Sequence, residues 1–331
     1  MGVPARRVVL WTTPETVGAG NEAEQVDPVL ALTRLGGVAR WGALRRMCSG
    51  RRLRRALRDG HIVRGYYGRY ALPHADAARA AGSRLTGYVS HTSAALHWGW
   101  AVKTAPTLPH VTVSRHRKIA AARRDGVVLH WRDLGADSVV EGWVTSPVRT
   151  VIDCCIDLPF DEALAVFDSS WRAGLKPRDV QLVALTLPRR QRDRVLAVAR
   201  AADPRAANPF ESVLRAIALS VPGLSVEPQV VVKDSTFWAR VDLADESLRM
   251  VIEAESFQFH GSRKAFDRDC RRYNSLVIRE WLVLRFTWEQ VMFEPELVAQ
   301  TLRALVDLRR RRHRRLRTAD NSTGSSSSVG A

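Results

Sequence analysis

The chain has 331 residues, 46% of them hydrophobic, and carries a formal net charge of +17. This hydrophobic fraction supports folded cores and excludes a wholly disordered chain, and the length predicts two or three domains. No apolar run approaches the ~20 residues that a membrane span needs, and the N-terminus lacks the apolar core of a secretory signal. We therefore expect a cytoplasmic protein without a membrane partner, in which Cys48, Cys154, Cys155 and Cys270 are reduced, buried thiols.

The positive charge is concentrated toward the N-terminus. Residues 27–81 contain twelve Lys and Arg against three Asp and Glu, a net of +9. Residues 208–300 contain eleven against fourteen, a net of −3. A basic excess favours a polyanionic partner, most often nucleic acid. Residues 208–300 have a net negative charge that repels phosphate, and the acids clustered there suggest that this region binds metal ions.

The first two segments are an extension and a small basic domain. Turn-forming residues dominate residues 1–26, which predicts a disordered extension. Residues 27–81 follow the order helix, helix, helix, hairpin, with the second helix expected over residues 38–47 and the third capped by Ser49. This order predicts a winged helix-turn-helix domain that binds DNA, its third helix entering the major groove. The expected DNA contacts are Arg51, Arg52, Arg54, Arg55, Arg64 and Arg69.

Residues 85–200 are predicted to form a middle α/β region. A helix is expected to begin near Ser90, followed by strands in HVTVSR and VVLHWRDL and by two helices. A hydrolase triad of Ser90, His91 and Asp153 is disfavoured because the chain has no G-x-S-x-G elbow. The histidines of this region lack a metal-binding spacing, so we expect them to be structural or on the surface. They are His91, His97, His110 and His130.

Five segments between residues 26 and 175 carry a family resemblance. They are GGVARWGALRR, LRRALRDGHIVRGYYGRYAL, SHTSAALHWGW, HVTVSR and TSPVRTVID. In this order they resemble the N-terminal winged-helix domain, and the segment after it, of AbiEi-type antitoxins from type IV toxin–antitoxin systems. The resemblance implies binding to operator DNA and repression of the protein's own promoter, and it leaves a cognate toxin open as a partner.

Residues 208–308 combine a helical and strand pattern with clustered acids. The predicted order is a helix capped by Asn208, three strands, a helix, a strand and a last helix. Strand alternation places Glu253 and Glu255 on one face, and Asp242 comes from the neighbouring strand. Acids this close raise each other's pKa, and a divalent cation removes that penalty. We therefore expect Mg²⁺ (or Mn²⁺) as the cofactor, and no organic cofactor.

Convergent carboxylates of this kind suit metal-assisted hydrolysis of a phosphodiester. His260, just beyond the third strand, is expected to polarise water or to donate a proton to the leaving group. An ordinary solvent-facing sheet surface that carries acids remains the alternative interpretation.

Four segments of this region resemble a nuclease family. NPFESVLR, VDLAD, MVIEAESFQFHG and DCRRYNSLVIREWLVLRFT are similar to the very-short-patch-repair (Vsr)-like family catalogued as domain of unknown function 559. That family has the PD-(D/E)XK nuclease fold, and the resemblance covers about residues 208–305. It implies that Asp242 and Glu253 bind the metal, that Glu211 is the acid of the first helix, and that His260 is the histidine after the strand.

Three further residues are placed by the same resemblance. Asp269 and Arg272 match the D-x-x-R of the following helix, where they form an ion pair, orient His260 or contact phosphate. Glu255 occupies the lysine position of the superfamily, and we expect it to bind a second ion or to position water.

The sequence thus predicts a multidomain α/β protein. It consists of the N-terminal winged helix-turn-helix, the middle α/β segment and a C-terminal restriction-endonuclease-like (PD-(D/E)XK) αβββαβ domain. Residues 309–331, seven arginines and then a Ser/Gly-rich end, are predicted to be a disordered basic tail. The expected function is Mg²⁺-dependent cleavage of DNA. A non-catalytic DNA-binding regulator of the AbiEi type is the alternative, cleavage of RNA stays open, and the oligomeric state is undetermined.

Overall fold

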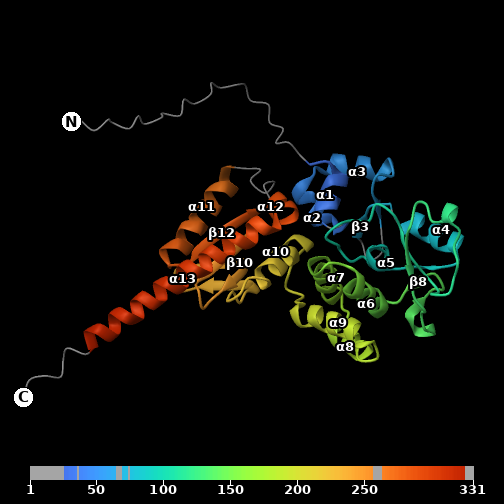
Figure 1. Cartoon of the computed structure of the whole chain (residues 1–331). Helices are drawn as coiled ribbons and strands as arrows, with labels where there is room; N and C mark the ends of the chain where they lie inside the picture. The colour runs from blue at the N-terminus through green and yellow to red at the C-terminus, as the bar shows by residue number, and fades with distance from the viewer. Residues whose placement is uncertain (1–25, 36, 65–68, 74, 256–262, 325–331) are drawn as a thin grey trace, which may run out of the picture.

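The computed structural model describes residues 26–324 except 36, 65–68, 74 and 256–262. Within these residues the protein is a mixed α/β structure with thirteen α-helices and three β-sheets, shown in Figure 1. This confirms the expectation of an α/β protein.

The N-terminal part packs three short helices against a small antiparallel sheet of order β1-β3-β2. Its core contains Leu32, Leu44 and Leu53, which are all fully buried. Ser49 caps the third helix as predicted, because its hydroxyl accepts the Arg52 N–H at 3.3 Å. The elements are α1 (Pro28–Arg34), β1 (Val38–Arg40), α2 (Trp41–Met47), α3 (Gly50–Arg58), β2 (Val63–Arg64) and β3 (Arg69–Ala71).

One boundary of this part differs from the sequence prediction. Residues 38–40, expected at the start of the second helix, form strand β1 and pair with β3. Pairing across the sheet is a non-local contact that overrides the helical pattern of the residues that follow.

The middle part consists of a mixed five-stranded sheet of order β6-β5-β4-β8-β7 and a group of helices that follows it. The helix that begins after Ser90, the two strands and the two helices predicted here are all present. The helices are α4 (Ala75–Leu85), α5 (His91–His97), α6 (Pro147–Asp157), α7 (Phe160–Arg172), α8 (Pro177–Ala184) and α9 (Arg189–Ala201). The strands are β4 (Tyr88–Val89), β5 (His110–Val113), β6 (Val128–Trp131), β7 (Val139–Val140) and β8 (Val144–Thr145).

The C-terminal part is a four-stranded sheet of order β12-β11-β10-β9, with both faces covered by helices. Met250 and Ile252 pack on one face against residues of α10, α12 and α13, whereas Val251 packs on the other face with Leu276 of α11. The helices are α10 (Pro209–Leu219), α11 (Arg263–Ile278), α12 (Trp288–Phe293) and α13 (Pro295–Gly324). The strands are β9 (Glu227–Lys233), β10 (Trp238–Asp245), β11 (Met250–Glu255) and β12 (Leu282–Thr287).

The last helix extends beyond its predicted end. We expected a disordered tail from residue 309, but α13 continues to Gly324. Arginine and leucine are good helix formers, and they continue a helix that packing has already nucleated. Residues 1–25 and 325–331, also predicted to be disordered, lie outside the described residues.

Contacts between the three parts are specific. Helix α10 packs on α7, where Arg215 and Asp168 form an ion pair of 2.6 Å between almost fully buried side chains. At the other end of the chain, Arg34 of α1 contacts Glu289 of α12 at 3.4 Å, so the N-terminal helices lie beside the C-terminal part (Figure 1).

Candidate functional site

Three acids from three different elements meet at one side of the C-terminal sheet. Glu211 comes from the first turn of α10, Asp242 from β10 and Glu253 from β11. The side-chain amide of Gln229 in β9 links two of them, because its Nε2 donates to Glu211 Oε2 at 2.9 Å and to Asp242 Oδ1 at 3.3 Å. Asn208, the predicted cap of α10, donates to the other Glu211 oxygen at 2.9 Å. The cluster therefore joins α10 to the sheet through side chains that hydrogen-bond to one another.

The backbone is irregular at the same place. The β10–β11 ladder pairs Asp245 to Leu243 with Met250 to Ile252 and stops there. The Ala254 N–H, two residues further on, donates to Asp242 Oδ2 at 2.9 Å. Gln229 has a φ of +56°, a left-handed conformation that is uncommon for a residue inside a strand. Strained or interrupted backbone of this kind concentrates at functional sites.

The electrostatics of the cluster favour uptake of positive charge. Burial, followed by the charge of Asp242, raises the pKa of Glu211 to about 7 and that of Glu253 to about 8. Burial also raises the pKa of Asp242, although the Ala254 N–H opposes this effect. Glu211 and Glu253 are only 6% and 4% exposed, so water does little to screen their repulsion. Near neutral pH the cluster therefore favours the binding of protons or of a cation.

Two arginines bind the acids of β11. Arg272 of α11 donates to Glu253 Oε1 at 3.0 Å and to the Tyr273 hydroxyl at 2.8 Å. Arg285 of β12 forms an ion pair of 2.6 Å with Glu255, which also accepts a hydrogen bond from the Tyr273 hydroxyl at 3.3 Å. Glu253 and Glu255 are therefore each held in place by a guanidinium.

The donor set fits a hard divalent cation. Asp242 and Glu253 are adjacent oxygen donors, and Mg²⁺ commonly takes one or two carboxylates while it keeps several waters. Burial and mutual repulsion leave the acids short of positive charge, as the raised pKa values of Glu211 and Glu253 indicate. A divalent cation would relieve this repulsion without a proton.

The structure brings together most of the residues that the sequence singled out in this region. Glu255 lies beside Glu253, whose pKa its charge helps to raise. Asp269 lies on α11 one turn from Arg272, and its charge contributes to the raised pKa of that guanidinium. His260 lies outside the described residues.

Sequence reasoning missed three members of this site: Gln229, Tyr273 and Arg285. A polar Gln inside the apolar run EPQVVVK was the available signal for the first of them. The ring of Tyr273 packs against the cluster that contains Val251 and Leu276.

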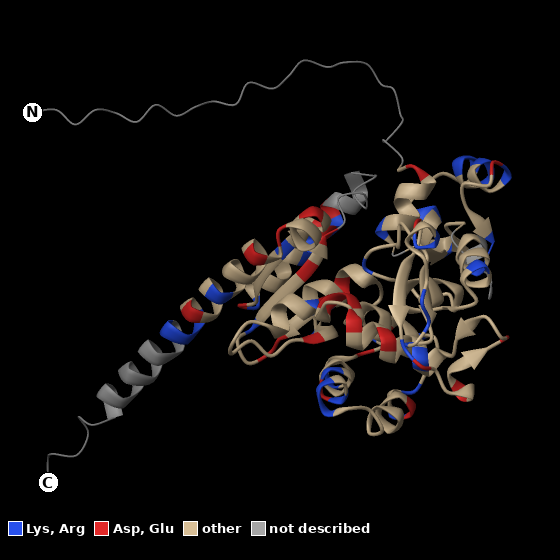
Figure 2. Ribbon diagram, turned by 45° about the vertical axis from the view of Figure 1, so that its right-hand side comes forward, with Lys and Arg blue, Asp and Glu red and all other residues tan. Residues whose placement is uncertain are grey.

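The predicted DNA-contacting arginines on α3 have exposed side chains. Arg51, Arg52, Arg54 and Arg55 lie on its outer side, with Leu53 and Ala56 buried beneath them. Arg55 forms an ion pair of 3.4 Å with Asp59. Figure 2 shows basic segments on the N-terminal helices and acidic segments around the C-terminal sheet. In the hairpin, Arg64 is exposed on β2, and the side chain of Arg69 lies outside the described set.

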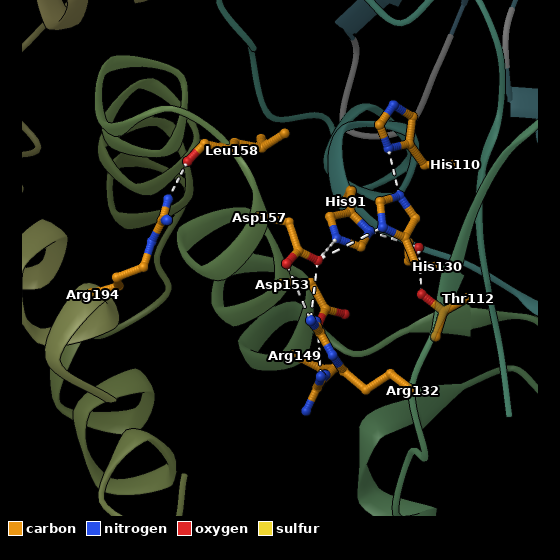
Figure 3. Close-up of polar contacts among 11 residues, drawn as sticks. His91, His110, Thr112, His130, Arg132, Arg149, Asp153, Asp157, Leu158 and Arg194 are labelled. Atoms are coloured by element: carbon orange, nitrogen blue, oxygen red, sulfur yellow. Dashed lines mark hydrogen bonds and ion pairs between the residues drawn. The ribbon is translucent and has the colours of Figure 1, made fainter. Parts of the chain in front are cut away.

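The middle part holds a second polar cluster that the sequence did not indicate. His91, His110 and His130 come together from α5, β5 and β6 and present ring nitrogens within 4.8 Å of one another (Figure 3). His91 Nε2 lies 2.9 Å from Asp157 Oδ2, at the end of α6. The triad disfavoured from sequence is not formed with Asp153, which instead pairs with Arg132 and Arg149.

Comparisons with known proteins give little. No known family profile and no curated protein matches this chain. Among solved structures, the chain is similar to the RV2827C protein from Mycobacterium tuberculosis, at 13% identity and a TM-score of 0.29. The match covers 60% of this chain and 83% of that one. A TM-score this low does not establish a shared fold. Among the described helices, none combines the length and the apolar character that crossing a membrane requires.

Proposed function

We propose that residues 208–308 form a metal-dependent nuclease domain of the PD-(D/E)XK type that hydrolyses DNA phosphodiesters. The observation that carries this proposal is the meeting of Glu211, Asp242 and Glu253 at an interrupted part of the sheet, with raised pKa values for all three. The order of elements, α10, β9, β10, β11, α11 and β12, supports it as well. Perturbed carboxylates of this kind cluster at catalytic sites.

Asp242 and Glu253 are the residues that would hold Mg²⁺ or Mn²⁺. When bound, such an ion activates a water molecule and neutralises charge on the phosphate. Gln229 orients Asp242 through its amide and fixes Glu211 at the same time. Arg272 holds Glu253 by one hydrogen bond at 3.0 Å, which sets the direction of the carboxylate. Arg285 and Tyr273 do the same for Glu255.

DNA is the proposed substrate because of the N-terminal part. Three helices, a small antiparallel sheet and an exposed arginine face on α3 support a winged helix-turn-helix domain over residues 27–81. Arginines that neutralise phosphates provide affinity independent of sequence. The contact of Arg34 with Glu289 places this domain beside the C-terminal part, within reach of the same nucleic acid.

Cleavage assays test the proposal. Purified protein would be incubated with supercoiled, single-stranded and mismatched DNA in MgCl₂ or MnCl₂. We expect cleavage that EDTA stops and that Glu253→Gln reduces by at least about 100-fold, since even residues behind a metal ligand are worth 10- to 100-fold. Glu246→Gln, which alters an exposed acid in the turn between β10 and β11, should cleave like the wild type. Absence of cleavage on every substrate would reject catalysis.

A non-catalytic DNA-binding regulator is the second candidate. Glu255 stands where the superfamily has lysine, and its ion pair of 2.6 Å with Arg285 favours a structural role for it. Under this alternative the protein binds DNA without cutting it, and Glu253→Gln leaves DNA affinity unchanged. A toxin partner would then be sought by co-purification with the full-length chain.

A further inference from the structure

The middle part contains a side-chain cluster that the proposed nuclease function does not use. His91 begins α5, His110 begins β5, His130 lies on β6 and Asp157 ends α6, so four elements distant in the sequence meet here (Figure 3). His91 is fully buried, and the side chain of His130 is 16% exposed. One ring nitrogen from each of the three histidines lies within 4.8 Å of the other two, a spacing at which they could share one metal ion.

We propose that His91, His110 and His130 bind one borderline transition-metal ion, Zn²⁺, through one nitrogen each, with Asp157 behind the ligands accepting a hydrogen bond from His91. His110 Nδ1 and His130 Nε2 are 3.1 Å apart. Two nitrogens on a tetrahedral zinc ion are about 3.3 Å apart, because Zn–N bonds measure about 2.0 Å. The pair therefore already has close to the separation that zinc requires.

Asp157 occupies the position of an orienting carboxylate. Its Oδ2 lies 2.9 Å from His91 Nε2 and 3.7 Å from His130 Nδ1. Metal-binding histidines usually donate their second N–H to such a group, which fixes the ring and raises its basicity. Arg132 in turn pairs with Asp157 at 3.1 Å, so the carboxylate is itself held from behind.

Hydrogen-bond contacts already engage both ring nitrogens of His91. Ser90 Oγ lies 2.9 Å from His91 Nδ1 and accepts a hydrogen bond from Thr112 Oγ1 at 2.8 Å, and Asp157 lies at the other nitrogen, Nε2. Zinc therefore binds His91 through Nδ1 and displaces the Ser90 hydroxyl, while the Nε2–H group keeps its hydrogen bond to Asp157.

The ring geometry defines what binding must change. The rings of His91 and His130 are stacked, with centroids 3.6 Å apart and planes inclined by 19°. Lone pairs lie in the ring plane, so these two rings must tilt toward each other to share an ion. The backbone of His91 has a φ of +52°, a strained value that a built site would account for.

Charge distinguishes this site from the acidic cluster of the C-terminal sheet. Here Asp153 and Asp157 are balanced by Arg132 and Arg149, so no excess negative charge attracts a cation. Affinity must come from imidazole coordination, which suits Zn²⁺ and not Mg²⁺. Three histidine ligands leave the fourth position of a tetrahedral ion to a water molecule, and the bound ion would connect α5, β5 and β6.

The test measures zinc bound by the full-length chain, prepared without a polyhistidine tag and stripped with EDTA. After dialysis against micromolar ZnCl₂, we expect one Zn²⁺ per chain by mass spectrometry of the metal, and a melting temperature several degrees higher. His110→Ala should weaken binding at least about tenfold. His116→Ala, at an exposed histidine, should bind like the wild type.

Clear results would overturn the proposal. Less than stoichiometric zinc on the wild-type chain would do so, as would zinc lost in Glu253→Gln but retained in His110→Ala. If His110→Ala does not fold, Co²⁺ added to the wild type serves as a second readout that needs no variant. The intense visible absorption of four-coordinate Co²⁺ supports the site, and the weak spectrum of six-coordinate Co²⁺ rejects it.

Discussion

Two clusters of acids in this protein differ in their balance of charge. In the middle part, Asp153 and Asp157 lie against Arg132 and Arg149. Although burial alone would raise it, hydrogen bonds from the neighbouring histidines and the charge of Arg132 hold the pKa of Asp157 well below its usual range. In the C-terminal part, Glu211, Asp242 and Glu253 repel one another, and their pKa values are raised.

The difference teaches that burial does not by itself determine the state of an acid. Asp153 in the middle part and Glu211 and Glu253 in the C-terminal part are buried, which costs free energy in each case. Guanidinium groups repay this cost in the middle part, and the acids there serve the fold. In the C-terminal part Arg272 contacts Glu253, but the pKa values of Glu211, Asp242 and Glu253 remain raised, so this site is a candidate for binding a cation.

The largest expected effect comes from breaking the balanced cluster. Asp153 is fully buried and pairs with Arg132 and with Arg149, the latter at 2.6 Å. Asp153→Ala leaves two guanidinium groups without that partner, which typically costs about 3–5 kcal/mol. Urea unfolding followed by circular dichroism measures the loss. Asp125→Ala, at an exposed acid whose backbone carbonyl makes its hydrogen bond, should change stability by less than about 0.5 kcal/mol.

The acidic cluster of the C-terminal part should make the folded protein less stable as pH rises. An acid paired with a base has the opposite effect, because its pKa is lowered on folding. The folded pKa values of Glu211 (about 7) and Glu253 (about 8) lie above the value of 4.5 for an ordinary glutamate. The folded state therefore binds more protons between these values, and stability in EDTA falls as pH rises from about 4.5 to about 8. Each unit of pKa difference is worth ~1.4 kcal/mol, so we expect a decrease of several kcal/mol.

Melting temperatures in EDTA and in MgCl₂ measure this decrease. Mg²⁺ should restore stability at the upper end of the range, where the acids are ionised, and have little effect near pH 5. Glu253→Gln removes the group with the higher pKa and should reduce both the decrease and the response to Mg²⁺. A melting temperature that is flat from pH 5 to 8 in EDTA would mean that the three acids are not short of positive charge.

The sequence was informative where structure is local and periodic. Alternation in MVIEAE placed Glu253 and Glu255 correctly, and Asn208 and Ser49 marked the helix starts at which they are found. Gln229 could not be assigned, because its left-handed backbone and its bridge from Glu211 to Asp242 depend on how α10 packs on the sheet.

The histidine cluster was hidden from sequence for a related reason. Its members come from a helix start and two strands, and no fixed spacing relates such positions. Only the pairing of β5 with β6, which sets His110 beside Val128 and Thr112 beside His130, brings the rings within reach.

The exposed arginine face of α3 carries excess positive charge, whereas the acidic cluster of the C-terminal sheet carries excess negative charge. Replacing Arg51, Arg52, Arg54 and Arg55 by Ala should weaken DNA binding roughly tenfold or more, and it should lower the slope of log affinity against log salt by up to about 3.6. Fluorescence anisotropy at several salt concentrations measures both quantities. The control removes four exposed arginines from α8 and α9. These are Arg178, Arg189, Arg190 and Arg200.

Equal losses in the two quadruple variants would show that net charge, and not the face of α3, determines binding. An unchanged salt slope in the α3 variant would remove the winged helix as the DNA contact. Loss of affinity in the α3 variant alone would show that the exposed arginines of α3 contact DNA. Excess charge of one sign would then mark a binding site on the surface of α3, as we propose for the buried acids of the C-terminal sheet.

The smallest effect is expected where an ion pair is exposed. Arg34 and Glu289 connect α1 to α12 at 3.4 Å, with side chains 21% and 51% exposed, and the Arg34 guanidinium lies 5.4 Å from the centre of the Trp288 ring. Solvent screens such a pair, so a double-mutant cycle of Arg34→Ala and Glu289→Ala should give a coupling below about 1 kcal/mol. Thermal unfolding of the four proteins measures it. A coupling above about 2 kcal/mol would mean that packing around Trp288 excludes water from the pair. The exposure of the two side chains would then fail to predict which ion pairs of this protein are weak and which are strong.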